Sequence, residues 1–278
     1  MELDISHRLT VLGHPQRLAV FRLLMRRYPD QVPATELAQS LGLKPSTLST
    51  YIKALSGAGL VRQDRQGTSL RYAIAIAAVR DTFDYLLNDC CRGRPDICVA
   101  PASDDRGART RKYNVLFICT GNSARSIFAE TILRDLAGDR FAAYSAGTKP
   151  RSELNPFAIE VLQQKGHDVS PLRAKNIEEF RQPDAPVFDF VFTVCDQAAN
   201  EECPAWSGQT ITAHWGMPDP VKVAGTDAEK SLAFQQTYGA LRNRMVGFTA
   251  LPIASLDRLS LQQAVDDLGQ SMMEGARE

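Results

Sequence analysis

The feature that most constrains this fold is an apolar run that ends in a cysteine and continues into a short polar loop. Residues 113–118 are mostly apolar, Cys119 follows them, and the loop leads through Arg125 and Ser126 into a helical pattern that extends to about Leu136. A buried strand, a tight turn and a helix are the unit from which parallel α/β sheets are built. We therefore expect a parallel sheet with a site at the carboxyl end of its first strand.

The loop after this strand has the composition of an oxyanion-binding turn. Backbone N–H groups between Cys119 and Arg125 can surround a tetrahedral anion, and the next helix adds the positive end of its dipole. The Arg125 guanidinium would bind the oxygens through two parallel donors. We expect this field to lower the pKa of Cys119 and Ser126 to stabilise its thiolate, so Cys119 is the expected nucleophile. The predicted oxyanion-binding loop comprises Thr120, Gly121, Asn122, Ser123 and Ala124.

Length and charge divide the chain into two parts. A chain of 278 residues that is 44% hydrophobic can fill two cores. Residues 101–111 contain no large apolar side chain and are predicted to be a linker between domains at 1–100 and 112–278. Lys and Arg outnumber Asp and Glu by six before residue 113, and acidic residues are in excess by six after it. This asymmetry favours a nucleic-acid-binding module joined to an enzyme.

The sequence shows no signal-peptide pattern and no run of about 18 apolar residues. We therefore expect a cytoplasmic protein without membrane contact. In a reducing compartment, six cysteines are expected to be reactive or ligating rather than joined in structural disulfides.

The first half is predicted to form a winged helix-turn-helix domain, mainly α with a β-hairpin wing. Pro45 suits the first position of a helix whose apolar stripe is Leu48, Ile52 and Leu55, and Gln66-Gly67-Thr68 separates two strand-like runs. A second helix is expected over residues 76–91, with an apolar face that would pack on a dimer mate. The residues expected to bind DNA are Ser46, Thr47, Ser49, Thr50, Lys53, Arg62, Arg65 and Arg71. A protein-interaction winged helix with a merely solvated polar face is the alternative.

This half, over about residues 5–98, resembles the ArsR-type winged-helix repressors. The resemblance rests on Leu12-Gly13-His14-Pro15-Gln16-Arg17-Leu18, on Ser46-Thr47-Leu48-Ser49, and on Ala58-Gly59-Leu60-Val61 before the arginine-bearing hairpin. It implies a homodimer that binds operator DNA and releases it when a metal or metalloid binds.

Three cysteines cluster where the expected dimer helix ends. Cys90 and Cys91 are adjacent, and Gly93 and Pro95 could turn the chain so that Cys98 returns toward them. Thiolates are natural ligands of thiophilic trivalent arsenic. The pattern resembles the carboxyl-terminal arsenite sites of one branch of these repressors, so arsenite is the expected effector. The alternatives are a core cysteine beside an incidental neighbour, or a zinc or cadmium site that would need a fourth ligand.

From residue 113 to about 250 the chain resembles the low-molecular-weight tyrosine phosphatase fold and, within it, the arsenate reductases. Besides the Cys119 loop, the resemblance rests on Ala129-Glu130, on Tyr144-Ser145-Ala146-Gly147-Thr148 and on His214-Trp215-Gly216-Met217-Pro218-Asp219-Pro220. It implies an α/β domain with a parallel sheet in which Asp219 is the general acid. Further strands are expected at 141–146, 188–195 and 210–215, and helices at 156–165, 228–246 and 259–272.

The resemblance also implies a cysteine relay that reduces arsenate to arsenite. Cys195 would attack Cys119, and Cys203 would then carry the disulfide to thioredoxin, or to glutaredoxin with glutathione, without an organic cofactor. Eight residues of α-helix separate two Cα atoms by about 12 Å, whereas a disulfide needs them within about 7 Å, so segment 196–203 would have to unwind.

A tyrosine phosphatase, or a noncatalytic oxyanion sensor fused to the repressor, is the alternative. Phosphatases of this fold usually place an aromatic residue after the Asp-Pro pair, whereas this chain has Val221 and Lys222. In a phosphatase, Cys195 and Cys203 would be packing residues. The four histidines, His7, His14, His167 and His214, show no ligand spacing and are expected to be structural or positioning residues.

Overall fold

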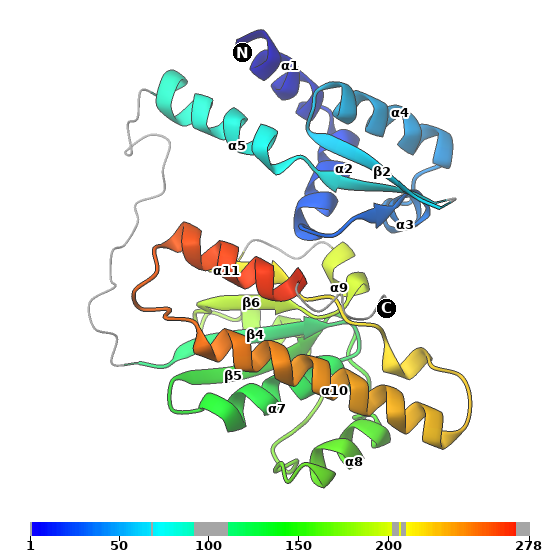
Figure 1. Cartoon of the computed structure of the whole chain (residues 1–278), viewed down its shortest axis with the longest axis vertical. Coiled ribbons are helices and arrows are strands. Elements are labelled where there is room, and N and C mark those ends of the chain that lie inside the picture. The colour runs from blue at the N-terminus through cyan, green and yellow to red at the C-terminus, as the bar shows by residue number, and fades with distance from the viewer. Residues whose placement is uncertain (1, 68, 92–110, 202–205, 207–209, 271–278) are drawn as a thin grey trace. The chain divides into compact units, whose positions relative to one another are not determined.

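The computed structural model describes residues 2–67, 69–91, 111–201, 206 and 210–270 (Figure 1). The chain divides into two compact units, Met1–Asp105 and Arg106–Glu278, and each has its own hydrophobic core. The division falls within the expected linker. Among the described residues, no helix combines the length and the apolar character needed to cross a membrane.

The first unit is a helix-turn-helix followed by a hairpin. Gly42 turns the chain between α3 and α4 with a φ of 62°, a left-handed conformation that glycine adopts at little cost. Leu48, Ile52 and Leu55 bury one face of α4. The helices are α1 (Glu2–Leu12), α2 (Pro15–Arg26), α3 (Ala34–Leu41), α4 (Pro45–Gly57) and α5 (Ile76–Tyr85), and the strands are β1 (Val32–Pro33), β2 (Val61–Gln66) and β3 (Ser69–Ile74).

The hairpin pairs β2 with β3 in antiparallel register, from Val61 opposite Ile74 to Gln66 opposite Ser69. Strand β1 adds to the other edge of β3, which gives the order β1-β3-β2. Val61 and Ile74 face the core, whereas Arg62 is exposed. The winged arrangement that the sequence predicts is confirmed for this unit.

The helix expected over residues 76–91 is not uniform. α5 ends at Tyr85, and Leu86–Cys90 form a π-helical turn. The N–H of Cys91 donates to the carbonyl of Leu86, five residues back, at 2.9 Å. Because a π-turn holds more residues per turn than an α-helix, the side chains after Tyr85 are rotated away from the stripe that a regular helix would give them.

The second unit contains a four-stranded parallel sheet in the order β5-β4-β6-β7. β4 lies between the second and third strands in sequence order, so the carboxyl end of β4 is the switch point at which α/β folds bind ligands. The strands are β4 (Tyr113–Cys119), β5 (Phe141–Gly147), β6 (Phe190–Thr193) and β7 (Ile211–His214). The helices are α7 (Arg125–Ala137), α8 (Pro156–Gln164), α9 (Asp196–Asn200), α10 (Asp227–Ala250) and α11 (Arg258–Gln270), with 3₁₀ turns at Ile177–Arg181 and Pro220–Lys222.

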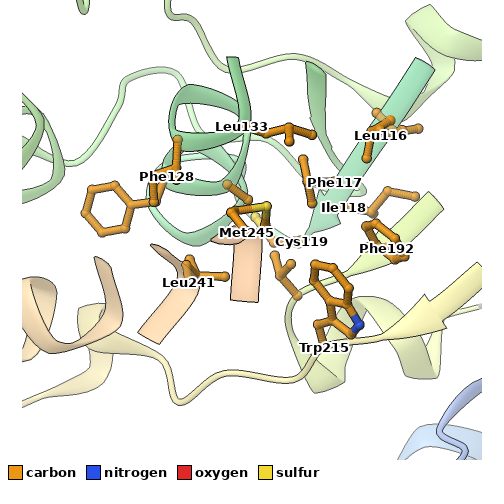
Figure 2. Close-up of a cluster of buried hydrophobic side chains, with 14 of the residues drawn as sticks. Leu116, Phe117, Ile118, Cys119, Phe128, Leu133, Phe192, Trp215, Leu241 and Met245 are labelled. Carbon is orange, nitrogen blue, oxygen red and sulfur yellow. The ribbon is translucent and has the colours of Figure 1, made fainter. Parts of the chain in front are cut away.

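Aliphatic and aromatic side chains together fill the core between the sheet and its helices (Figure 2). The Trp215 indole stacks on Phe192 with ring centroids 4.0 Å apart, and Phe248 of α10 meets both rings edge-on. Cys119 belongs to this buried cluster. The expected α/β domain with a parallel sheet is confirmed.

Two predicted boundaries near Cys195 are corrected. The strand expected over 188–195 covers only Phe190–Thr193, because Cys195 begins α9 as its N-cap and its Sγ accepts from the N–H of Ala198 at 3.4 Å. The helix expected through residue 203 ends at Asn200, and Glu201 is extended. Less helix therefore has to unwind than the spacing suggested.

Candidate active site

The loop between β4 and α7 turns its carbonyl groups outward. The carbonyls of Cys119, Thr120 and Gly121 accept from the N–H groups of Thr148, Lys149 and Arg151 at 3.1, 2.9 and 2.9 Å. In a trans peptide, the N–H points opposite to the carbonyl. The N–H groups of Thr120, Gly121 and Asn122 therefore point away from residues 148–151, and the N–H of Asn122 donates to Cys119 Sγ.

Cys119 lies at the bottom of this loop. Its Sγ is 2.9 Å from Ser126 Oγ and accepts from the N–H of Asn122 at 3.1 Å. The thiol is 3% exposed and Ser126 is fully buried. The structure thus places Cys119 and Ser126 in contact, as the predicted partnership requires.

Asn122 holds the shape of the loop from within. It has a φ of 43°, and its Nδ2 donates to Ser126 Oγ at 2.9 Å and to Ser145 Oγ at 2.8 Å. Its Oδ1 accepts from the N–H of Lys175 at 2.6 Å. Sequence reasoning assigned no role to Lys175, because its contact with the loop arises only from the tertiary fold.

The Asn122 contacts continue into a partly buried ion pair. Ser145 Oγ donates to Glu130 Oε2 at 2.5 Å, and Lys175 Nζ lies 2.8 Å from the same carboxylate oxygen. The conformation of the loop is therefore tied to α7 through Glu130 and to β5 through Ser145.

Burial raises the pKa of the Cys119 thiol, and the neighbouring Cys195 raises it further. Hydrogen bonds from Ser126 and Asn122 and the charge of Arg125 lower this pKa without offsetting the loss of water. The expectation that the loop gives Cys119 a lowered pKa is therefore wrong for the loop as folded.

The expected general acid lies beside the expected anion clamp. Asp219 Oδ2 is 3.0 Å from Arg125 Nη2, and Arg125 Nη1 donates to the carbonyl of Met217 at 3.0 Å. The second Asp219 oxygen, Oδ1, accepts from the N–H of Val221 at 3.2 Å. Both terminal nitrogens of Arg125 therefore contact the segment 217–219.

Cys195 lies two residues beyond the end of the neighbouring strand β6, next to the Cys119 loop. It is 2% exposed, and its Sγ is 3.5 Å from Thr120 Oγ1. The structure brings this second cysteine to the site, whereas Cys203 lies outside the described residues.

The structure describes only part of the predicted arsenite site in the first unit. Cys90 is an exposed free thiol, Cys91 is disulfide-bonded, and Cys98 lies outside the described residues. The expectation that the cysteines are not joined in disulfides is therefore wrong for Cys91, which must be reduced before it can bind a metalloid as a thiolate.

The residues expected to bind DNA fall into two groups by exposure. Arg71 is partly buried and donates to the carbonyl of Gln31 at 3.2 Å, and Thr47 is also partly buried. The exposed members are Ser46, Ser49, Thr50 and Lys53 on α4 and Arg62 and Arg65 on β2.

Comparison with known proteins agrees with this division. The family model for low molecular weight phosphotyrosine protein phosphatases matches residues 114–260, and a helix-turn-helix domain model matches residues 12–64. The arsenate reductase of Bacillus subtilis (strain 168) is 35% identical over 134 residues, which are 48% of this chain and 93% of that protein. The arsenate reductase of Halalkalibacterium halodurans is 35% identical over 137 residues, 49% of this chain and 95% of that protein.

A solved structure described as an arsenate reductase in oxidized state is 27% identical, with a TM-score of 0.39, and the match covers 48% of this chain and 92% of that one.

Fold and loop together define an α/β protein with a buried cysteine that accepts a backbone N–H of the loop. Since the family match covers more than half of the chain, the chain belongs to the low molecular weight phosphotyrosine protein phosphatase family. A helix-turn-helix domain precedes the family domain on the same polypeptide.

Proposed function

We propose that the second unit reduces arsenate to arsenite through a cysteine relay. The observation that carries the proposal is the position of Cys195, a buried free thiol beside the Cys119 loop. Phosphoryl transfer needs one cysteine, whereas a two-electron reduction needs a second thiol that can reach the first. The names of the 35% identical relatives support the same reaction.

In the first step, the Cys119 thiolate attacks arsenic while the loop N–H groups and Arg125 bind the arsenate oxygens. One oxygen leaves as water with a proton from Asp219, and a sulfur–arsenic bond forms. Ser126 stabilises the thiolate before the attack, at a hydrogen-bond distance of 2.9 Å.

In the second step, the Cys195 thiolate attacks Cys119 Sγ. A disulfide forms and the sulfur–arsenic bond breaks. Its electron pair remains on arsenic, which leaves as arsenite in the trivalent state. The two thiols have together supplied two electrons, so the reaction is balanced.

In the third step, Cys203 attacks Cys195 and releases Cys119 as a thiolate. An external dithiol of the thioredoxin class then reduces the Cys195–Cys203 disulfide, with glutaredoxin and glutathione as the other candidate donor. None of these reaction steps uses an organic cofactor.

The surroundings of Asp219 support arsenate over an aryl phosphate. The residues after the Asp-Pro pair are Val221, which is 37% exposed, and Lys222, so no aromatic ring is available there to stack on a phenyl group. A small inorganic oxyanion needs no such platform.

The test is arsenate-dependent NADPH oxidation in the presence of thioredoxin and thioredoxin reductase. Wild-type protein should consume NADPH, whereas Cys119→Ser and Cys195→Ser should not, although Cys195→Ser should still bind phosphate. Wild-type protein that consumes no NADPH, and a Cys195→Ser variant that hydrolyses an aryl phosphate at the wild-type rate, would instead identify a phosphatase.

For the first unit, we propose an ArsR-type repressor that leaves operator DNA when arsenite binds Cys90, Cys91 and Cys98. The exposed hydroxyl, lysine and arginine side chains of α4 and β2 support DNA binding, since they provide phosphate contacts beside a helix that fits a major groove. Phe83 on α5 is 52% exposed, which supports a homodimer through this helix.

A further inference from the structure

A single histidine holds the chain on both sides of Cys195. His214 Nδ1 is 2.8 Å from Thr193 Oγ1, and His214 Nε2 is 3.2 Å from Asp196 Oδ1. Thr193 is the last residue of β6 and Asp196 is the first of α9, so Cys195 lies in the short link between them. The His214 side chain is fully buried.

The surroundings fix the imidazole in this place. Thr193 and His214 are register partners in the β6–β7 pair, and the N–H of Trp215 donates to the carbonyl of Thr193 at 2.8 Å. Gly216 lies directly against the pair: a Cβ there would be 2.7 Å from His214 Nε2 and 2.8 Å from Asp196 Oδ1. The backbone at Gly216 passes so close to the imidazole ring that no side chain would fit there, and it therefore helps to enclose the ring.

The two contacts of the imidazole differ in exposure. The Thr193 contact joins neighbouring strands of the sheet, whereas the Asp196 side chain is 52% exposed. The Asp196 contact is also the longer of the two. It is therefore the one that can open when α9 changes conformation, while the end of β6 stays in place.

We propose that His214 is a positioning residue for Cys195, because its imidazole holds both flanks of this thiol and so keeps Cys195 Sγ beside the Cys119 loop. The inference rests on the proposed reductase function. It concerns the second step, in which Cys195 attacks Cys119 Sγ, the sulfur–sulfur bond forms and arsenic keeps the electron pair of the broken sulfur–arsenic bond. His214 takes no part in bond making and acts through the placement of Cys195.

The test uses the full chain with Cys203→Ser, so that the Cys119–Cys195 disulfide accumulates. Single-turnover reaction with arsenate is followed by mass spectrometry of unreduced peptides. His214→Asn keeps a polar atom near the Nδ1 position and loses the Asp196 contact, and Asp196→Ala removes the same contact from the exposed side. Each variant should form the disulfide about tenfold more slowly, while phosphate affinity stays within about twofold of the parent.

A double-mutant cycle separates positioning from general damage. The combined His214→Asn and Asp196→Ala variant should be no slower than either single variant, because both remove one shared contact. Asp139→Ala is the matched control, since Asp139 is an exposed aspartate of the same unit and should leave the rate unchanged.

The outcomes are distinguishable. A Cys203→Ser parent that forms no disulfide with arsenate would overturn the reductase function and this inference with it. Disulfide formation at the parent rate in Asp196→Ala would overturn the inference alone, and this exposed position tests it even if His214→Asn does not fold. Additive slowing in the double variant would also contradict it.

Discussion

At the scale of single residues, Cys119 shows burial and hydrogen bonding acting in opposite directions. The sulfur lies at the end of a strand in the aromatic core, and this loss of water favours the neutral thiol. The bonds from Ser126 and Asn122 favour the thiolate. The reactivity of the site depends on this balance, which single substitutions can move in either direction.

Alkylation of Cys119 by iodoacetamide should become faster as pH rises through the neutral range into the alkaline range. The attacking species is the thiolate, and a thiol with a raised pKa is mostly protonated at neutral pH, so its thiolate fraction grows about tenfold per pH unit below the pKa. The measurement is the alkylation rate of Cys119 against pH, resolved by peptide mass spectrometry.

Two variants should shift this profile in opposite directions. Ser126→Ala removes a bond that lowers the pKa, so its profile should move to higher pH. Cys195→Ala removes a neighbour that raises the pKa, so its profile should move to lower pH. Shifts of the same sign would contradict the assigned causes.

Gly147 should tolerate no side chain, because β5 passes the Cys119 loop at close range. A Cβ at Gly147 would be 2.6 Å from the carbonyl oxygen of Thr120 and 3.0 Å from Asn122 Cβ. Gly147→Ala should therefore lower the free energy of unfolding by about 1–3 kcal/mol. Urea denaturation measures this loss, and phosphate binding should weaken with it.

Gly239→Ala is the matched control for Gly147→Ala. Gly239 lies inside α10, and nothing lies within 4 Å of a Cβ placed there. Alanine should raise the free energy of unfolding by up to about 1 kcal/mol, because it is the better helix former. Equal destabilisation by both substitutions would rule out the proposed close contact at Gly147.

At the scale of elements, the sequence predicts well what local pattern determines. The strand before Cys119 and the hairpin after α4 follow from apolar runs and turn residues that occur together in the chain. Contacts between distant segments are not encoded in this way. Ser145 and Lys175 bond to Asn122 across 23 and 53 residues.

The same limit applies at the ends of elements and to pKa values. No periodicity distinguishes the π-turn after Tyr85 from a continuing α-helix, and none marks the end of α9 at Asn200. The prediction of a lowered pKa for Cys119 took into account only the charges of the loop. The burial that raises this pKa arises from the folded core and cannot be read from the loop alone.

Arg244 joins α10 to the segment that follows β7 and to α11, and its removal should destabilise the second unit. The side chain is 2% exposed. Its Nη1 donates to the carbonyl of Trp215 at 2.8 Å, and its Nη2 to that of Gly269 in α11 at 3.1 Å. Arg244→Met would leave these buried carbonyls without their donor, at a cost of about 2–4 kcal/mol in the free energy of unfolding.

The measurement for Arg244→Met is urea denaturation followed by tryptophan fluorescence. Arg242→Met is its matched control, since Arg242 lies on the exposed face of the same helix. The control should change the free energy of unfolding by less than about 0.5 kcal/mol. A similarly small effect of Arg244→Met would show that these bonds do not hold α10 to the segment at Trp215 and to α11.

At the scale of the whole molecule, two family matches lie on one chain without overlapping, at residues 12–64 and 114–260. The basic excess lies before residue 113 and the acidic excess after it, but four of the basic residues lie at 106–112, so the first unit itself holds 13 Lys and Arg against 11 Asp and Glu. The exposed basic side chains on α4 and β2, rather than the net charge of the unit, suit a polyanionic partner, and the second unit contains the loop that we propose binds the oxyanion. If both proposals hold, the enzyme produces the effector that its own DNA-binding unit detects.

The fused chain should therefore leave its operator in response to arsenate, but only while its relay works. An operator duplex is first selected from a random-sequence library, and binding is followed by fluorescence anisotropy at fixed salt. With thioredoxin, thioredoxin reductase and NADPH present, arsenate should release wild-type protein but leave Cys119→Ser bound, whereas arsenite should release both. Release of Cys119→Ser by arsenate would mean that the pentavalent oxyanion acts directly, so reduction would not be the step that couples the two units.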